Sequence, residues 1–247
     1  MKCFVISLMK EQKRRQHITR EFSSQNIPFN FFDAITPEQI DDEASRLKVN
    51  IKNTKMSKGE VACLLSHMAI LQHAVDEGFP YVSIFEDDIH LGIDASRYLC
   101  TDDWIPENMQ FIKLEMFNNI TKGSFWNNHK IDGQRGLFKL EGRHLGAAGY
   151  LVSTRLAQVI LEEIRQYGEL IPIDKVVFED LIILQKIDVY QLQPAICVQD
   201  DILDRKNSLL HSSLNQDREL QAKEKMNISQ KIKREIERLL CRRIQFK

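Results

Sequence analysis

The stretch YVSIFEDDIH, residues 81–90, places three consecutive acids, Glu86, Asp87 and Asp88, directly after an apolar run. Residues 81–85 have the β-branched and aromatic composition of a buried strand. Side chains alternate along an extended chain, so Glu86 and Asp88 are expected on one side and Asp87 on the other until the chain turns. Two carboxylates would then share a face, where a divalent cation would relieve their repulsion.

The residues alone leave several interpretations of these acids open. Asp87 or Asp88 could cap a following helix, an interpretation at least as good as a metal site when the acids are taken alone. Oxygen ligands of this kind also suit Mg²⁺ or Mn²⁺, which take their remaining ligands from water and a substrate diphosphate. A receiver-like phosphoacceptor pocket conflicts with position, because two strands and two helices are predicted before Glu86 and Asp132 lies in a polar segment.

The flanking sequence predicts an α/β fold. Strands are expected at residues 3–8, 29–35, 81–85, 109–117, 147–153 and 191–198. Helices are expected at residues 11–25, from a capping box at Ser57 and Glu60 to Gly78, and at 154–167. The polar segment 118–143 lacks periodicity and is interpreted as a loop over a substrate or as an inert one. Ligands of such sheets gather at the carboxyl ends of strands, where the three acids are placed.

Composition is that of an ordinary globular chain long enough for one large domain. It has 247 residues, 43% hydrophobic and 28% charged, with a formal net charge of −1 that gives no general attraction to nucleic acid. The five cysteines are scattered without a CxxC pair, which favours a reducing compartment. Charged residues follow the first apolar run at once, so neither a signal peptide nor a membrane span is expected there, and the prediction is cytoplasmic.

The order of short motifs resembles glycosyltransferase family 25, the lipopolysaccharide and collagen galactosyltransferases. The decisive pair is GEVACLLSH at 59–67 followed by IFEDD at 84–88. Other matches are VISL at 5–8 with Arg14 and Arg15, FDA at 32–34, GYLVS at 149–153, PID at 172–174 and QP at 193–194. The family usually has an acid where Lys13 stands and often a histidine where Lys175 stands. The resemblance covers residues 1 to about 210.

The resemblance implies a Rossmann-like, GT-A type nucleotide-sugar transferase with a mixed, mostly parallel central sheet and a DxD-type motif. It implies Mn²⁺ or Mg²⁺ on Asp88 and Glu86, and an inverting transfer of a hexose, galactose or alternatively glucose, from a UDP-sugar to a lipooligosaccharide or other glycan. A non-catalytic nucleotide-sugar binding protein is a further alternative. The residues that would contact the donor are Ser7, Leu8, Arg14, Arg15, Ala34, Ser66, His67 and Asp87.

The general base is expected at Asp174, which could equally be a helix N-cap. Its rivals are Glu115, Glu179 and Asp180. His211 is a candidate third metal ligand. Gly149 and Tyr150 would border the sugar pocket or serve close strand packing. The simpler alternatives are a solvated helix face for the two arginines and a packed core residue for His67.

The C-terminal part of the chain is basic. From Leu220 onward there are nine Lys or Arg and three Glu, a local balance of +6. An isoleucine and leucine stripe at helical spacing predicts that residues 216–247 form a basic amphipathic helical tail, separate from a catalytic domain at 1–215. Such a helix could lie on an anionic membrane surface, at the inner face of the cytoplasmic membrane, or pack on the core or on a second subunit.

Overall fold

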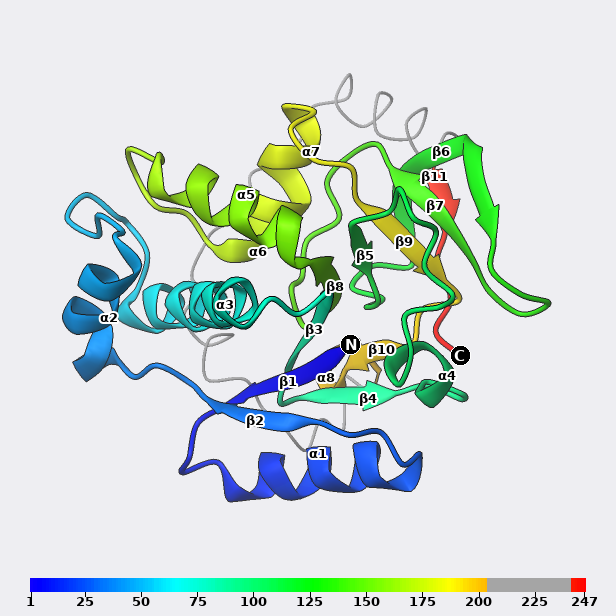
Figure 1. Cartoon of the computed structure of the whole chain (residues 1–247), viewed down its shortest axis with the longest axis horizontal. Helices are drawn as coiled ribbons and strands as arrows, with labels where there is room; N and C mark the ends of the chain where they lie inside the picture. Colours follow the sequence, from blue (N-terminus) through cyan, green and yellow to red (C-terminus); the bar gives the residue numbers. More distant parts are fainter. Residues whose placement is uncertain (204–240) are drawn as a thin grey trace, which may run out of the picture.

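The central sheet is built from strands far apart in the sequence. The computed structural model describes residues 1–203 and 241–247, and within them nine strands join in the order β11-β6-β7-β9-β5-β8-β3-β1-β2 (Figure 1). The strands are β1 Lys2–Ser7, β2 Asn30–Asp33, β3 Tyr81–Glu86, β5 Phe111–Lys113, β6 Ile120–Lys130, β7 Gly136–Leu140, β8 Gly149–Ser153, β9 Tyr190–Gln193 and β11 Cys241–Arg243. A separate two-stranded sheet pairs β4 Ile89–Leu91 with β10 Cys197–Gln199.

Most strands of the large sheet point the same way. β1 pairs in parallel with β2 and β3, and β5 pairs in parallel with β9. β8 runs antiparallel between β3 and β5, which leaves β3 and β5 parallel to each other. β7 and β11 are also reversed. The expected α/β fold with a mixed, mostly parallel sheet is confirmed, and the carboxyl ends of β1, β2, β3, β5 and β9 lie along one edge.

Helices cover both faces of the sheet. The helices of the described residues are α1 Gln12–Ser24, α2 Ile40–Leu47, α3 Lys58–Glu77, α4 Ser96–Leu99, α5 Thr154–Arg165, α6 Ile173–Lys175, α7 Leu181–Ile183 and α8 Asp200–Leu203, with short turns η1 Pro37–Gln39 and η2 Val176–Asp180. Figure 1 shows α2 and α3 on one side of β1 and β2 and α1 on the other. The alternation of β1 explains this: Phe4 and Ile6 pack in the core under α3, and Cys3 and Val5 in the core under α1.

The long helix α3 begins and ends where the sequence predicts. The Ser57 hydroxyl accepts the Glu60 N–H at 3.3 Å, and the Glu60 carboxylate accepts the Ser57 N–H at 3.0 Å. Gly78 ends the helix in the left-handed conformation, with φ of 66°. The capping box and the glycine are local signals, which is why the sequence sufficed here.

The prediction of a loop over residues 118–143 is wrong. These residues contain β6 and β7, an antiparallel hairpin with a register shift between Gly123 and Asn128. Much of β6 is exposed and polar, so it lacks the alternation that marks a half-buried strand. The hairpin is held by tertiary pairing, with β9 on one side and β11 on the other.

Two predicted strands differ in length. The strand expected at 109–117 is β5, which covers only Phe111–Lys113 before the backbone turns aside to bond Gly149 and Cys197. The strand expected at 191–198 is two strands, β9 and β10, on either side of Pro194. Proline has no N–H to give to a sheet, so the ladder breaks there and β10 pairs with β4 instead.

The end of the predicted tail is a strand and not a helix. Cys241–Arg243 form β11 against β6, and Ile244 is buried in the core. The Arg242 guanidinium lies 4.2 Å from the centre of the Phe138 ring and donates to the Ser124 carbonyl at 2.6 Å. Residues 216–240 of the tail and the proposed boundary at 215 lie outside the described residues. Of the described helices, none has the length and hydropathy needed to cross a membrane.

Candidate active site

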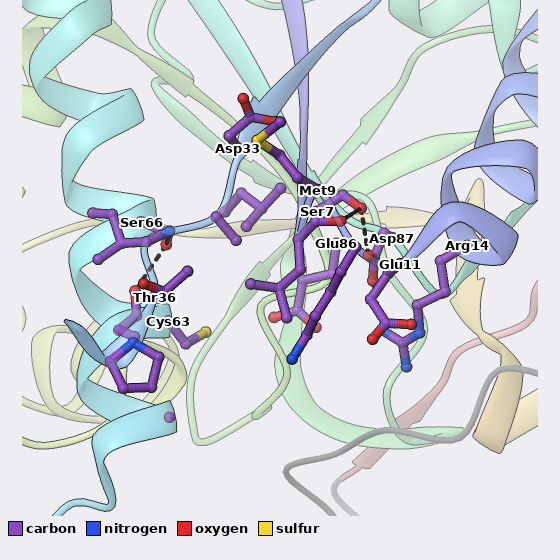
Figure 2. A pocket seen from close by; sticks show the side chains of 18 of the residues that line it. Ser7, Met9, Glu11, Arg14, Asp33, Thr36, Cys63, Ser66, Glu86 and Asp87 are labelled. Atoms are coloured by element: carbon purple, nitrogen blue, oxygen red, sulfur yellow. Dashed lines mark hydrogen bonds and ion pairs between the residues drawn. The ribbon is translucent and has the colours of Figure 1, made fainter. Parts of the chain in front are cut away.

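A cavity of about 940 Å³ opens at the carboxyl edge of the parallel strands. It is lined by the ends of β1, β2 and β3, the start of α1, the turn η1 and one face of α3. In Figure 2, Ser7, Glu86, Asp87 and Arg14 lie together on one side, with Thr36, Cys63 and Ser66 opposite. This is the edge at which ligands bind in sheets of this kind.

Asp87 is held from two elements. The Ser7 hydroxyl donates to one carboxylate oxygen at 2.7 Å, and Arg14 on α1 donates to the other at 2.5 Å. Burial raises the pKa of Asp87, and the Arg14 charge acts in the opposite direction. Asp87 therefore fixes the start of α1 against the end of β1, and it also faces the cavity.

Glu86 and Asp88 share a face, as the alternation of the strand predicts. The Gln199 side-chain amide lies 3.4 Å from a Glu86 oxygen and 3.3 Å from an Asp88 oxygen. Burial first, and the neighbouring Glu86 charge second, raise the pKa of Asp88 to about 8. The chain turns at Asp87 and Asp88 and enters strand β4, so the interpretation of these acids as a helix N-cap is wrong.

These carboxylates fit the Mn²⁺ or Mg²⁺ that the resemblance implies. Burial, and after it the negative charge of the half-buried Glu86, raises the pKa of Asp88, and a cation between the two carboxylates would relieve both effects. The clusters of three metal-binding side chains in the described residues do not include Asp88. Glu86 and Asp88 would therefore hold the ion with few protein ligands, leaving positions for water and a diphosphate. His211, the candidate third ligand, lies outside the described residues.

The two arginines are not a solvated helix face. Arg14 lines the cavity and also lies 3.7 Å from Asp88, with its side chain 16% exposed. Arg15 donates to the Ser7 carbonyl at 2.8 Å and pairs with Asp33, so it joins the ends of β1 and β2. Arg15 does not line the cavity and holds the ends of β1 and β2 together, and its donor contact stays a prediction.

Of the other predicted donor residues, Leu8, Ala34 and Ser66 line the cavity and His67 does not. The Ser66 hydroxyl accepts the Ile35 N–H at 2.9 Å, which ties α3 to the end of β2. His67 is fully buried, with Nδ1 2.9 Å from the Tyr150 hydroxyl and Nε2 3.7 Å from Glu86. Tyr150 is 1% exposed and stacks on His67, so it supports the site from behind and does not border the cavity.

A second charged cluster is sealed at the end of β5. Lys113 and Glu115 are both fully buried and lie 3.4 Å apart. Lys113 also donates to the carbonyls of Leu145 and Gly146, and Glu115 accepts the Ala148 N–H at 3.0 Å. Burial raises the pKa of Glu115 to about 7, although Lys113 acts to lower it.

Asp174, the predicted base, lies next to this second cluster. One of its oxygens accepts the Gly146 N–H at 3.4 Å and the other accepts the Lys175 N–H at 3.0 Å. It sits inside the first turn of α6, whose N-cap is Pro172, so Asp174 is not itself the cap. Gly146, with φ of 88°, links Asp174 to Lys113 and leaves no room for a side chain beside Glu115.

The rival bases Glu179 and Asp180 lie on η2 and, like Asp174 and Glu115, are not among the residues that line the cavity. Glu179 pairs with Arg143 at 3.4 Å, and Asp180 accepts the Tyr167 hydroxyl at 3.2 Å. Gly149 serves close packing: a Cβ there would lie 2.2 Å from the Cys197 sulfur. The alternative of strand packing thus holds for Gly149.

Sequence reasoning missed Gln199 and Lys113. Gln199 reaches the acids through the pairing of β10 with β4, a contact between residues more than one hundred positions apart. Lys113 had a visible signal: with Glu115 it forms a pair of opposite charges two residues apart in an otherwise apolar segment, on one side of an extended chain.

Comparison with known proteins identifies the family. The model of glycosyltransferase family 25, described as LPS biosynthesis protein, matches residues 1–177. A Haemophilus influenzae protein named as a glycosyltransferase is 38% identical over 241 residues, covering 96% of this chain and 84% of its own. The lipooligosaccharide biosynthesis protein lic2B of the same species is 34% identical, covering 87% and 82%.

A third relative and one solved structure complete the comparison. The lacto-N-neotetraose biosynthesis glycosyltransferase LgtE of Neisseria meningitidis is 34% identical, covering 92% of this chain and 85% of its own. A solved glycosyltransferase involved in glycosylation of the PBCV-1 major capsid superposes with a TM-score of 0.46 at 9% identity, covering 88% of this chain and 97% of its own. By its family match and its relatives, this chain belongs to glycosyltransferase family 25 and is a glycosyltransferase of lipopolysaccharide or lipooligosaccharide biosynthesis.

Proposed function

We propose that this enzyme transfers galactose from UDP-galactose to a lipooligosaccharide acceptor, with inversion at the anomeric carbon and dependence on Mn²⁺ or Mg²⁺. The observation that carries the proposal is the cavity at the carboxyl edge, which is lined by Glu86, Asp87 and Asp88 and in which Arg14 pairs with the two aspartates. The acceptor class is supported by the names of the relatives, and galactose by the motifs shared with the family. Glucose is the alternative donor sugar.

The donor would lie with its diphosphate beside Asp88 and Arg14. A divalent cation held by Glu86 and Asp88 would supply charge neutralisation for the departing UDP. Arg14 adds a second positive charge, and its contact with Asp87 fixes the direction of its guanidinium. The buried pair of His67 and Tyr150 supports Glu86 from the α3 side.

A donor screen tests the proposal. Purified protein is mixed with UDP-galactose, UDP-glucose or UDP-N-acetylglucosamine and a truncated lipooligosaccharide, with Mn²⁺ or with EDTA, and UDP release is followed. We expect release from UDP-galactose with Mn²⁺ and loss of release in EDTA. Turnover of UDP-glucose and not of UDP-galactose would mean that the donor sugar is glucose. Binding of a UDP-sugar without turnover on any acceptor would favour a non-catalytic nucleotide-sugar binding protein. Full activity in EDTA would contradict the metal assignment.

We propose Asp174 as the general base that takes the proton of the acceptor hydroxyl. Both of its oxygens accept backbone N–H groups, which orients the carboxylate, and it is slightly exposed whereas Glu115 is sealed. Asp174→Asn should lower kcat by about 10²-fold or more while the KM for the donor stays within a small factor. Glu115→Gln is the matched control. A larger kcat loss in Glu115→Gln than in Asp174→Asn would reverse the assignment.

We propose peripheral attachment to the inner face of the cytoplasmic membrane, because the acceptor is a lipid-linked glycan and residues 220–247 are basic. Deleting residues 227–247 would also remove β11 from the sheet, so a charge change is the better test. Replacing Lys231, Lys233 and Arg234 by glutamate should abolish flotation with anionic liposomes while donor binding is kept. Unchanged flotation would contradict the proposal.

A further inference from the structure

A cluster of metal-binding side chains lies on the α1 side of the sheet, outside the donor cavity. His17 and Glu21 are four residues apart on α1 and share one face of the helix, and His90 faces them from β4. One ligand atom from each residue lies within 4.8 Å of the other two. The two imidazole rings meet edge to face with centres 4.7 Å apart. None of the three residues lines the cavity.

Hydrogen bonds already select the ring nitrogens that a metal would need. His17 Nε2 lies 2.7 Å from the Ile89 carbonyl, which can only accept, so Nε2 carries the proton and Nδ1 carries the lone pair. His90 Nε2 lies 2.7 Å from an Asp200 carboxylate oxygen, which assigns its lone pair to Nδ1 in the same way. That Nδ1 is 4.0 Å from Glu21 Oε1.

Glu21 is oriented as well. Its Oε2 accepts the Leu91 N–H at 2.7 Å, which leaves Oε1 directed toward His90. Metal-binding histidines almost always donate their second N–H to a carboxylate or a backbone carbonyl, and metal-binding carboxylates are themselves hydrogen-bonded. All three residues of this cluster have such a supporting contact.

We propose that His17, Glu21 and His90 form a second metal site, which binds Zn²⁺ and joins α1 to β4. Two imidazoles and one carboxylate are a zinc ligand set with one position left for water. The carboxylates of Glu21 and Asp200 together balance the charge of the ion. The side chains of His90 and Glu21 are about one quarter exposed, which leaves a path for the ion and for the water.

The position of the site gives it a structural role toward the donor cavity. His17 lies one turn after Arg14 on α1, and His90 lies two residues after Asp88. Asp200 supports His90 and its N–H donates to the Asp88 carbonyl at 2.8 Å. An ion that joins α1 to β4 therefore holds the helix that carries Arg14 beside the strand that directly follows Asp88. The inference does not depend on which sugar is transferred.

Zinc binding by full-length protein tests the proposal. The double variant Glu86→Gln, Asp88→Asn serves as the background, so that neither the donor-site acids nor the cluster of Cys63, His67 and Glu86 contributes, and the apoprotein is titrated with ZnCl₂ by calorimetry. We expect one Zn²⁺ per chain and a Tm that rises with zinc. Adding His17→Gln or His90→Gln should weaken binding at least about 100-fold and abolish the Tm rise, and Glu21→Gln should weaken it about 10- to 100-fold. His129→Gln, on β6, is the matched control and should bind as the background does.

Replacement of zinc by Co²⁺ gives an independent readout. The bound ion should show the visible absorption of a four-coordinate Co²⁺ site, and the His90→Gln variant should lose it. Circular dichroism of each zinc-free variant verifies that it is folded. If a histidine variant does not fold, Glu21→Gln, which is nearly isosteric, still tests the site. Zinc affinity unchanged in folded Glu21→Gln and His90→Gln variants, or absence of zinc binding in the Glu86→Gln, Asp88→Asn background, would overturn the proposal.

Discussion

Two carboxylate clusters lie at the carboxyl ends of β3 and β5, two parallel strands that flank β8, and they differ in how their charge is balanced. At the end of β3, Glu86, Asp87 and Asp88 line a cavity and meet Arg14, which is itself partly exposed. At the end of β5, Glu115 meets Lys113, and both side chains are fully buried. In both clusters burial raises the pKa of a carboxyl group, to about 8 for Asp88 and to about 7 for Glu115.

The difference separates a binding site from a structural pair. Three acids against one arginine leave negative charge facing a cavity, where a cation and a diphosphate can complete the balance. The charge of Glu115 is already balanced by Lys113. Lys113 also donates hydrogen bonds to the carbonyls of Leu145 and Gly146. In this protein, acids at the end of a strand are a candidate ligand site where protein cations do not balance their charge, so that a bound metal ion can do so.

The largest effect is expected from breaking the sealed pair. Lys113→Met should lower the free energy of unfolding by about 3–5 kcal/mol, because Glu115 is left buried without its counter-charge. Urea denaturation followed by circular dichroism measures this. Lys139→Met is the control, since Lys139 pairs with Asp188 at the surface and should cost less than about 1 kcal/mol. Equal losses of unfolding free energy in the two variants would mean that the buried pair of Lys113 and Glu115 stabilises the fold no more than a surface ion pair does.

Asp88→Asn should affect activity and not folding. We expect a loss of about 100-fold or more in kcat/KM, because a ligand of the proposed cation is neutralised. The Tm should be unchanged or higher, since the variant removes an acid whose burial, with its raised pKa, costs stability above about pH 4. Asp94→Asn, in an exposed turn, is the matched control. Retained metal-dependent activity would rule out the assignment of Asp88.

The pH dependence of stability should differ between the clusters. An acid whose pKa is raised by folding binds its proton more tightly in the native state, so it lowers stability as pH rises from its unfolded pKa through its folded pKa. Relative to Asp88→Asn, wild type should therefore lose stability from about pH 4 to pH 8, by at most about 1.4 kcal/mol per pH unit. Relative to Glu115→Gln the loss should end near pH 7. A flat difference curve for either pair would show that its acid is not shifted.

The smallest effect is expected at Ser7. Ser7→Ala removes one hydrogen bond to Asp87 and leaves the contact with Arg14. We expect the free energy of donor binding to weaken by about 1 kcal/mol. It should appear as a roughly fivefold rise in the KM for the donor with kcat nearly kept. Ser45→Ala, at an exposed position of α2, is the control. A kcat loss as large as that of Asp88→Asn would mean that Asp87 takes a direct part in the chemistry.

Local signals in the sequence predicted the parallel half of the fold well. β1, β3, α1 and the capped helix α3 lie where apolar periodicity and caps placed them. The expected shared face of Glu86 and Asp88 is confirmed by the Gln199 amide, which reaches both. Asp87 lines the same cavity as its two neighbours, because the chain turns directly after β3. The hairpin of β6 and β7 was missed because an exposed polar strand has no periodic signal and depends on its partners. The pairing of Arg15 on α1 with Asp33 at the end of β2 was not predicted, because it joins two elements through the tertiary structure.

The sequence by itself determined that an apolar strand ends in three acids, which of them share a face, and to which family the chain belongs. These properties depend on residue order and on the two-residue period of a strand. Only the tertiary structure decided that Gln199 joins those acids, that Glu115 is sealed with Lys113, and that two histidines and Glu21 face one another across α1 and β4. The contacts of Gln199 and of the two histidines join distant segments, so no local pattern records them. The spacing of Lys113 and Glu115 is visible in the sequence, but only the tertiary structure shows that both side chains are buried.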